Sequence, residues 1–436
     1  MINPNLAGAM PFVLSILLVA TPCAAGRAAD ASPVTLEGAA REAVEWHPSL
    51  IEAAGMLAAR GEDVKAARAG YLPTISAGVG SGYDSRVSGT LRPRPQVGAS
   101  QMLFDFGKVS SEIAGANAGT RIGRAEMLLA VDALIRDTGY AIIEYQRAAA
   151  QRDIAREQAQ RVEEIGDLVG KRAALGAATR SDALQAQARV EAAMASLATV
   201  EAAERRWASN LAFLLGRDAP PAAVSADVPD WLMRSCSGPV PAWETVPLVM
   251  AAEAQADRAA AALRRSRADR YPTLSIGGDA STDVTAPLGN RSIYNVGLRV
   301  SSNIFAGGVT RARARGAAFE LEAAQAATRR VRNESSQRLA EARQQIESLS
   351  QVVATLQSRQ TNMRETGRLY RIQYLEMGTR TLVDLLNAEQ EFQQVRFEAV
   401  NVAQTLRSLQ VDCLYLSGRM RDAFALSGAT VRGVTL

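Results

Sequence analysis

The sequence repeats itself once, at a spacing of about 200 residues, and this repetition limits the folds that the chain can adopt. Four segments of the first half recur in the second half in the same order. The pairs are YLPTIS (71–76) with YPTLS (271–275), LFDFG (103–107) with IFAGG (304–308), GAATRSDALQAQ (176–187) with GTRTLVDLLNAE (378–389), and LLGR (214–217) with YLSGR (415–419). Because the order is kept and the spacings differ by only a few residues, we infer an internal duplication of one structural plan.

Each copy is predicted to begin with a helix and to continue with two short strands. The helices are expected at about 35–69 and 243–270, and the strands at about 72–83, 96–104, 273–283 and 292–305. In the last strand Val296, Leu298 and Val300 alternate with polar or small residues, which is the period of two typical of a strand. The residues that begin and follow the strand pairs are Pro73, Gly107, Pro272 and Gly308.

A very long helix follows each strand pair, at about 108–173 and 310–377, and neither stretch contains a proline. Roughly 66 helical residues extend for about 100 Å. In the first stretch Leu128, Val131, Ile135 and Ile142 have the spacing of a coiled-coil-like seam. Gly176 and Gly378 are predicted to end these helices.

A return helix is predicted in each copy, at 181–215 and 381–416. The expected N-caps are Thr179 or Ser181 for the first and Thr379 or Thr381 for the second. The organisation we predict is a signal peptide at 1–25, repeat 1 at 30–217, a proline-rich inter-repeat linker at 218–241, repeat 2 at 242–419 and a loose C-terminal tail at 420–436.

The amino terminus has the pattern of an export signal. An apolar run of about nine residues, 12–20, is too short to span a bilayer and is followed by small residues. We expect cleavage after Ala25 or Ala29. Cys23 follows Pro22, which is a poor match to a lipoprotein signal, so we expect no acylation. The mature protein is therefore expected to be exported without a transmembrane helix.

Composition excludes several classes of function. The 49 basic and 45 acidic residues are mixed along the chain, without the basic block that tracks nucleic acid. The single histidine, His47, excludes most His-based metal sites and any Ser-His-Asp arrangement with a choice of partner, and no nucleophile elbow or phosphate loop is present. Neither enzymatic activity nor a cofactor is expected. Cys236 and Cys413 show no CxxC spacing or disulfide framework, so we do not expect a bond between them.

The four strands point to a membrane. No other sheet is predicted that could cover their apolar faces, and their lengths suit transmembrane β-strands. Four strands cannot close a barrel, and open edges are not tolerated in lipid. Three copies of the chain would supply twelve strands, and the same symmetry would arrange the long helices into a tube. The expected fold is therefore mainly α, with a small membrane β part.

The two-repeat plan, the YLPT and FDFG motifs and above all GTRTLVDLLNA (378–388) resemble the TolC family of outer-membrane channel proteins. The resemblance covers nearly the whole mature chain. It implies a homotrimer in the outer membrane of a Gram-negative cell, with a twelve-stranded β-barrel in the lipid and an α-helical barrel in the periplasm. The implied partners are a periplasmic adaptor and an inner-membrane transporter of the ABC or RND type.

The resemblance also places the channel entrance at the turns 176–182 and 378–384. Arg380 matches the family position that ties neighbouring helices shut, and Asp384, with Asp182 of repeat 1, could form a carboxylate ring that selects cations. Asn387 stands where better-known members often carry a second Asp. Tyr374 is out of register with the tyrosine used as a tie, because Leu375 holds that position. The alternative for both aspartates is simple helix capping.

The function predicted is a passive exit duct, for which three alternatives stay open. Type I protein secretion is favoured over drug or small-molecule efflux because the chain lacks the lipobox common in efflux relatives. A periplasmic coiled-coil adaptor or scaffold would need compact β-domains around the hairpin, which the four isolated strands do not provide. An exported hydrolase would need a catalytic motif that the sequence does not offer.

Overall fold

The computed structural model describes residues 33–82, 92–238, 242–282 and 292–436. The first half of the chain comprises α1 (Leu36–Trp46), α2 (Pro48–Ala69), β1 (Thr74–Gly82), β2 (Arg92–Phe104), α3 (Lys108–Ala174) and α4 (Arg180–Leu215). The short α5 (Asp230–Met233) lies between the halves. The predicted signal peptide falls outside the described residues.

The second half has the same order of elements. It comprises the 3₁₀ turn η1 (Trp243–Thr245), α6 (Pro247–Ala268), β3 (Thr273–Ser281), β4 (Ile293–Ser301), α7 (Val309–Ile372), the π-helical turn η2 (Gln373–Met377) and α8 (Leu382–Leu416). The chain ends with α9 (Met420–Ala423), β5 (Thr430–Val431) and β6 (Val434–Thr435). The long helices, return helices and strands lie within a few residues of their predicted positions.

The first predicted helix is in fact two helices that meet at His47. The Thr35 hydroxyl caps α1 by accepting from the Gly38 N–H at 3.1 Å. Pro48 is the first residue of α2, where its missing N–H removes no helical bond. His47 Nδ1 accepts from the Ser49 N–H at 3.3 Å and so caps α2. The one histidine of the chain therefore has a structural role at this break.

The four long strands form one antiparallel sheet in the order β1-β2-β3-β4. β2 is longer than predicted because it includes Pro93 and Pro95. In the ladder these prolines pair with β1, since the register of β2 with β3 begins at Gln96. On the other side, the Pro95 carbonyl accepts from the Thr282 N–H at 3.1 Å, a bond that does not need a proline N–H. β2 is an edge strand over this stretch, and a proline is tolerated there because its missing N–H breaks no ladder bond.

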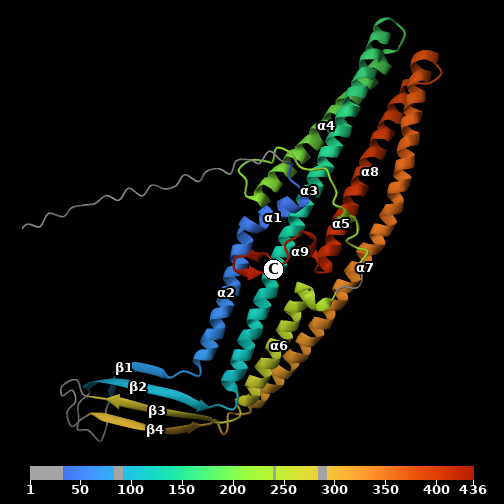
Figure 1. Ribbon diagram of the computed structural model, residues 1–436. Coiled ribbons are helices and arrows are strands. Elements are labelled where there is room, and N and C mark those ends of the chain that lie inside the picture. Colours follow the sequence, from blue (N-terminus) through green and yellow to red (C-terminus); the bar gives the residue numbers. More distant parts are fainter. Residues whose placement is uncertain (1–32, 83–91, 239–241, 283–291) are drawn as a thin grey trace, which may run out of the picture. The chain divides into compact units, whose positions relative to one another are not determined.

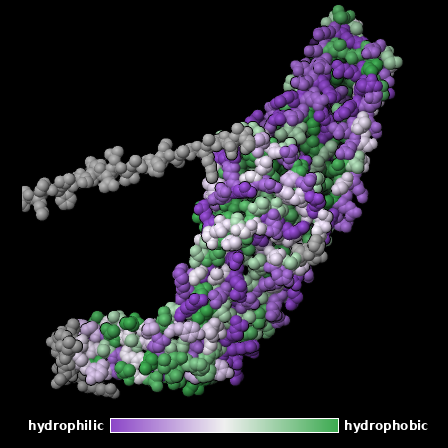
Figure 2. All heavy atoms as spheres, in the orientation of Figure 1, coloured by the Kyte–Doolittle hydropathy of each residue, from purple (hydrophilic) through white to green (hydrophobic). Residues whose placement is uncertain are grey.

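One face of this sheet is apolar and the other is polar. The register places Ile75, Ala99, Gly278 and Val296 opposite one another on the apolar face. Ile75 and Val296 expose 76% and 82% of their surface. The opposite face carries small and polar residues, among which the Asn295 amide donates to Asp279 at 2.8 Å. Figure 2 shows apolar residues gathered over the visible side of the sheet, whereas hydrophilic residues dominate the long helices.

The largest core lies where α3 passes α1, α4 and the C-terminal residues. Val131, Ile135 and Ile142 of the predicted α3 seam are fully or almost fully buried, and Leu128 is 6% exposed. The face of α1 that packs on this core is mostly alanine, which allows the helices to approach closely. The coiled-coil-like spacing of the α3 residues therefore identified true core positions.

The C-terminal residues are packed, so the prediction of a loose tail was wrong. Met420 and Phe424 are fully buried, and Leu426 is 4% exposed. The Phe424 ring meets Trp231 of α5 edge-on, with centroids 4.9 Å apart. Strands β5 and β6 then form a small hairpin. The apolar residues in 420–426 are too few to give a clear helical or strand period, which is why the sequence alone suggested a loose segment.

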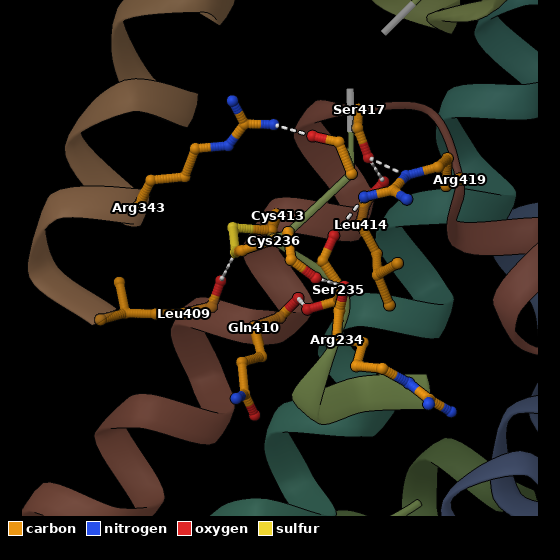
Figure 3. The surroundings of a disulfide bond; sticks show 12 residues. Arg234, Ser235, Cys236, Arg343, Leu409, Gln410, Cys413, Leu414, Ser417 and Arg419 are labelled. Atoms are coloured by element: carbon orange, nitrogen blue, oxygen red, sulfur yellow. Dashed lines mark hydrogen bonds between the residues drawn. A yellow bond between two sulfur atoms is a disulfide. The ribbon is translucent and has the colours of Figure 1, made fainter. Parts of the chain in front are cut away.

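Cys236 and Cys413 form a disulfide bond, with Cα atoms 5.4 Å apart, although no bond was expected (Figure 3). The two cysteines are 177 residues apart in the sequence, so no local pattern predicted this pairing. Neighbouring contacts hold the same segment: the Ser235 hydroxyl donates to the Gln410 carbonyl at 2.8 Å, and Arg343 donates to the Gly238 carbonyl at 2.8 Å. The inter-repeat segment is therefore fastened to α8 and α7.

Among the described residues, no helix combines the length and the apolar character needed to cross a bilayer.

Candidate functional site

The two turns predicted as the channel entrance have the same backbone design. Gly176 and Gly378 adopt left-handed φ values of 76° and 62°, a conformation that suits glycine at a helix end. After each turn a threonine and an aspartate form a reciprocal capping box, made by Thr179 with Asp182 and by Thr381 with Asp384. Of the threonines and serine that were candidates for these caps, the structure selects Thr179 and Thr381.

The capping geometry defines what the two aspartates do. In repeat 1 the two bonds between Thr179 and Asp182 are both 3.1 Å long. In repeat 2 the Asp384 N–H donates to the Thr381 hydroxyl at 3.2 Å, and the Thr381 N–H donates to Asp384 Oδ2 at 3.3 Å. One carboxylate oxygen in each pair is thus bound to its own turn. The capping alternative is therefore correct within one chain, and it leaves part of each carboxylate available to solvent or ions.

Arg380 lies on the α7–α8 turn and contacts three groups of its own chain. Its guanidinium lies over the Tyr370 ring at 4.5 Å, Nε donates to Gln373 Oε1 at 3.2 Å, and NH1 is 3.9 Å from Asp384. An ion pair of Arg380 with Asp384 within one chain is therefore present but long. Arg380 remains 43% exposed, so it is accessible to a neighbouring chain.

The sequence did not identify Tyr370 and Gln373 as partners of Arg380, because the chain that joins them to Arg380 passes through the π-helical turn η2. This turn spans Gln373–Met377 and replaces the regular α-helical end that was predicted. It includes Tyr374, which instead lies under the Arg172 guanidinium of α3 at 5.3 Å. Tyr370 and Tyr374, which are one helical turn apart, thus each contact an arginine side chain. Their spacing in the sequence was a usable signal that both rings lie on one face of the helix end.

Asn387 joins the two return helices. Its side-chain oxygen accepts from Arg189 of α4 at 3.2 Å, and Arg189 also donates to Gln390 of α8. Asn387 is exposed and does not contact Arg380 or Asp384 in the described structure. The structure therefore brings Arg380 and Asp384 together, places Asp182 on the equivalent turn, and gives Asn387 a different partner.

An apolar cluster beneath the turns packs the two hairpins together. Val169 of α3, Ala186 of α4 and Leu385 of α8 are each 0–1% exposed, and Leu382 and Leu386 pack beside them. Tyr370 and Tyr374 lie at the margin of this cluster. The turns are thus held on a packed base rather than on flexible loops.

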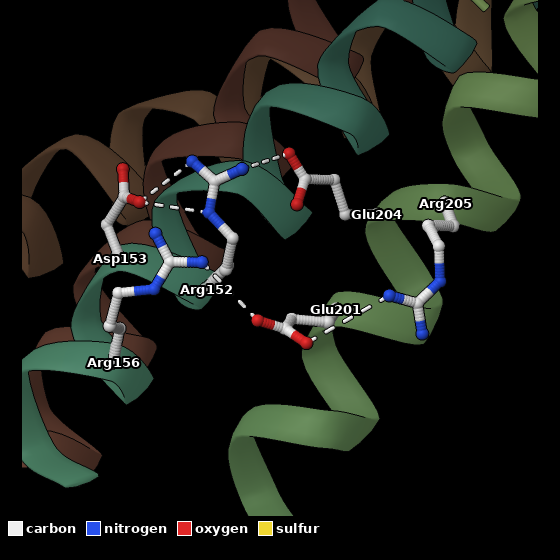
Figure 4. A network of polar contacts seen from close by, with 6 residues as sticks. All are labelled: Arg152, Asp153, Arg156, Glu201, Glu204 and Arg205. Atoms are coloured by element: carbon white, nitrogen blue, oxygen red, sulfur yellow. Dashed lines mark hydrogen bonds and ion pairs between the residues drawn. The ribbon is translucent and has the colours of Figure 1, made fainter.

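Charged contacts continue this packing along the helices. Between α3 and α4, Arg156 lies 3.4 Å from Glu201, and Arg152 reaches Glu204 while also contacting Asp153 at 2.8 Å (Figure 4). Such partly exposed pairs each contribute about 0–1 kcal/mol, so they fix the helix alignment more than they stabilise the fold.

A second charged cluster joins α3 to α8. Arg396 lies 2.5 Å from Glu157, and Arg161 contacts both Glu157 and, at 3.6 Å, Glu389. Burial raises the pKa of Glu389, and Arg161 opposes this effect. Burial also acts to raise the pKa of Glu157, but hydrogen bonds from Arg396 and Arg161 lower it overall. The Arg161 and Arg396 guanidinium groups lie over the Phe392 ring, which adds cation–π attraction.

The strand ends have capping features of their own. Pro73 and Pro272 precede β1 and β3, and Gly107 and Gly308 begin α3 and α7 with left-handed φ values of 92° and 84°. In repeat 1 the buried Asp105 accepts from the Gly107 and Val109 N–H groups at 2.9 and 2.6 Å. This cap was not predicted from the sequence, although an Asp two residues before the N-cap Gly107 was a usable signal.

Among the residues that the structure describes, no group of three or more His, Cys, Asp or Glu side chains is arranged to hold a metal ion.

Comparison with known proteins agrees with this architecture. The family described as outer membrane efflux protein matches residues 39–217 and 241–412. Protein CyaE of Bordetella pertussis is 26% identical over 334 residues, which cover 67% of this chain and 70% of that protein.

Solved structures share the fold at low sequence identity. The CusC structure, from a study of its folding and transmembrane channel formation, has a TM-score of 0.78 at 17% identity and covers 88% of this chain and 91% of CusC. The outer membrane protein VceC of Vibrio cholerae has a TM-score of 0.75 at 17% identity and covers 88% of this chain and 96% of VceC. The predicted family and location are confirmed, and this family and fold are those of channels rather than enzymes. Because the family match spans most of both halves, the chain belongs to the outer membrane efflux protein family, the TolC-like channels that lie in the outer membrane and extend into the periplasm.

Proposed function

We propose that three copies of the chain form a passive duct that crosses the outer membrane and continues into the periplasm. The observation that carries this proposal is the four-stranded sheet, which exposes one continuous apolar face. Ile75, Val79, Val296, Leu298 and Val300 are each at least 68% exposed on this face. A soluble protein rarely leaves such a patch open, whereas lipid would cover it.

The sheet edges support the number of chains. β1 and β4 are the edge strands, and within the described residues each pairs on one side only. Unpaired backbone groups are costly in lipid, so each β4 would pair with β1 of the next chain until the ring closes. Three chains give twelve strands, with the polar face inward around Asp279, Asn295 and Arg299.

The turns at 176–182 and 378–384 would form the periplasmic entrance of this duct. With three chains around one axis, three Asp384 carboxylates could form a ring that concentrates cations. Arg380 would favour the closed state by its contacts on the turn and across to a neighbouring chain. The open state would then be a minor population that increases when partner proteins bind.

The proposed partners are a periplasmic adaptor and an inner-membrane transporter, which supplies the energy. Type I protein secretion through an ABC transporter is the first candidate, because Cys23 lacks a lipoprotein signal context. Efflux of small molecules through an RND or ABC transporter is the second, because the family is described as efflux proteins.

Membrane fractionation followed by mass measurement of the detergent complex tests the duct. We expect the protein to stay in the outer-membrane fraction after a salt wash and to have three times the mass of the mature chain. A soluble periplasmic protein, or a monomer in mild detergent, would contradict the proposal.

Photo-crosslinking at the turns would identify the partners and thereby the class of cargo. Leu175 and Met377 are 84% and 63% exposed, so a crosslinker can replace either without disturbing the core. A crosslinker at Phe319 on α7, which is 69% exposed, is the control. We expect the turn positions, but not Phe319, to capture an adaptor or transporter.

A further inference from the structure

A basic depression lies beside the junction of the helices with the sheet. At this junction β2 leads into α3 and α6 leads into β3 (Figure 1). The depression has a volume of about 370 Å³. Its lining includes Phe106 and Ser110 from the α3 side and Arg264, Arg267 and Tyr271 from the α6 side. This volume is at the small end of ligand sites, so it suits a headgroup-sized occupant.

The two arginines of the depression lack an ion-pair partner among the described residues. Arg264 and Arg267 are exposed, and within the described residues neither has a carboxylate at ion-pair distance. Arg265, between them in sequence, differs: it pairs with Glu112 at 2.9 Å and with Asp269 at 3.3 Å. The positive charge in the depression is therefore available to an anion, and a planar guanidinium suits phosphate oxygens.

The aromatic residues place this charge relative to the membrane. The Phe106 ring stacks on Tyr271 with centroids 5.1 Å apart, and the Phe104 ring meets Phe106 at 4.7 Å. Phe104 pairs with Leu274, which lies on the apolar face of the sheet. The apolar strand face is thus followed first by aromatic rings and then by arginines. This is the order in which acyl chains, interface and phosphate groups follow one another in a lipid leaflet.

The backbone of Phe106 has an unfavourable conformation, so placing this ring costs conformational free energy. Phe106 has a φ of 55°, in the left-handed region that disfavours residues with a side chain. At the equivalent position of the second copy, Gly307 has a φ of 57°. A glycine at position 106 would relieve this strain. Phenylalanine there instead costs about 1 kcal/mol of backbone free energy, which indicates that its ring has a role of its own.

The other copy lacks the arginines. Tyr71 corresponds to Tyr271, and the residues four and seven positions before it are Ala67 and Val64, which are buried. The same positions before Tyr271 are Arg267 and Arg264. One basic depression per chain is therefore expected, and not two.

We propose that Arg264 and Arg267 bind the phosphate of an anionic glycerophospholipid from the periplasmic leaflet of the outer membrane. Phe106 and Tyr271 lie at the level of its ester groups. This proposal rests on insertion of the apolar strand face into lipid, as in the proposed function. An anionic lipid is preferred over a zwitterionic one because both arginines lack an acidic partner among the described residues.

Native mass spectrometry of the purified complex, titrated with phosphatidylglycerol or phosphatidylcholine, tests the site. The variant is Arg264→Gln/Arg267→Gln. The control is Arg329→Gln/Arg338→Gln, which removes two exposed α7 charges for which no ion pair is found in the described structure. We expect wild type and control to retain one phosphatidylglycerol per chain. The variant should bind it roughly ten- to thirty-fold more weakly.

The outcomes separate this proposal from its alternatives. Equal phosphatidylglycerol retention by variant and control would overturn it, as would equal retention of the two lipids by wild type. If inorganic phosphate displaces the lipid at millimolar concentration, the site is a free-anion site and the lipid assignment fails. Phe106→Gly should weaken retention severalfold while leaving the complex assembled. Failure of the proposed function would appear earlier, as a complex that neither assembles nor inserts into lipid.

Discussion

At the scale of single residues, each aspartate of the two turns has two properties that a substitution can separate. One is the oxygen that caps the helix, and the other is the carboxylate charge that could attract cations. Asp384 caps α8 through one oxygen, yet its side chain is 39% exposed, so its carboxylate also faces solvent. A substitution to alanine would remove both properties together. Asparagine keeps an oxygen that can accept from the Thr381 N–H and removes only the charge.

Asp384→Asn is therefore expected to lower cation selectivity with assembly unchanged and with little change in closure, because the contact between Asp384 and Arg380 is long at 3.9 Å. The reason is that the proposed ring concentrates cations through its charge, whereas the capping bond does not need the charge. Planar-bilayer recordings of reversal potential in a salt gradient measure this. Unchanged ion preference would mean that the constriction lies elsewhere and that Asp384 serves only as a cap.

Arg380→Ser is expected to raise single-channel conductance and the leakage of large antibiotics, with the trimer intact. It removes the contacts to Tyr370, Gln373 and Asp384 in each of three chains. Each contact contributes about 0–1 kcal/mol, but three copies together could bias closure by a few kcal/mol. Arg180→Ser, an exposed arginine at the start of α4, is the control and should leave conductance unchanged. Equal conductance in the wild type and in both variants would remove Arg380 from the gate.

Asp132 gives the fold a pH dependence. It is 1% exposed in α3, and burial raises its pKa to about 7, although Arg421 Nε lies 3.5 Å away and opposes the shift; Asp422 adds to it. The folded state therefore holds this proton up to about pH 7, whereas an unfolded Asp loses it near pH 4. Stability should thus fall as the pH rises from about 4 to about 7, by about 4 kcal/mol at most.

Thermal unfolding of Asp132→Asn tests this reasoning. The variant should lose much of the decrease in unfolding temperature that the wild type shows between pH 5 and pH 8. Asp63→Asn, at an exposed site on α2, should keep the wild-type pH dependence. The same pH dependence in all three proteins would show that Asp132 titrates with an ordinary pKa.

At the scale of elements, the strong periodicities were sufficient to predict the main helices and strands. Val131 and Ile135 are core residues because a buried seam must repeat with the turn of the helix, and this repeat is visible in sequence. The alternation around Val296 similarly predicted which strand face is apolar. Family resemblance, rather than periodicity, gave the meaning of Arg380.

Contacts between distant segments could not be predicted in this way. The Cys236–Cys413 bond, the buried Phe424 and the link between Arg189 and Asn387 each join segments separated by more than 170 residues. No local pattern records such pairings. The π-helical turn at Gln373–Met377 was missed for a different reason, since its residues individually favour an ordinary helix end.

The disulfide is expected to stabilise the joint between the repeats. The bond closes a loop of 177 residues, so its removal by Cys236→Ser/Cys413→Ser should cost about 2–5 kcal/mol of unfolding free energy. Chemical denaturation with and without reductant measures this. Reductant should lower the stability of the wild type to that of the variant and leave the variant unchanged. A wild type unaffected by complete reduction would show that the bond adds no stability.

At the scale of the whole molecule, the two faces of the sheet must meet different surroundings. The face that carries Tyr294, Val296 and Leu298 is exposed and apolar, and the face that carries Asn295, Gly297 and Arg299 is small and polar. In the proposed trimer the first face meets lipid and the second meets the aqueous duct. A charged residue introduced into β4 is therefore expected to have a different effect at each of two adjacent positions, because one position faces lipid and the next faces the aqueous duct.

Val296→Lys should impair assembly in the outer membrane, whereas Gly297→Lys should not. A lysine on the lipid side near the middle of the bilayer costs about 2–4 kcal/mol per chain, and the trimer multiplies this cost by three. A Cβ atom added at position 297 would have no neighbouring atom within 4 Å, so a side chain fits on the polar face. The lysines there would instead add three positive charges to the duct and reduce cation conductance. Quantifying heat-resistant trimer in outer-membrane fractions tests the first effect, and bilayer recordings test the second. If Val296→Lys assembles as well as Gly297→Lys, the apolar face does not contact lipid, and the sheet must be covered by protein instead.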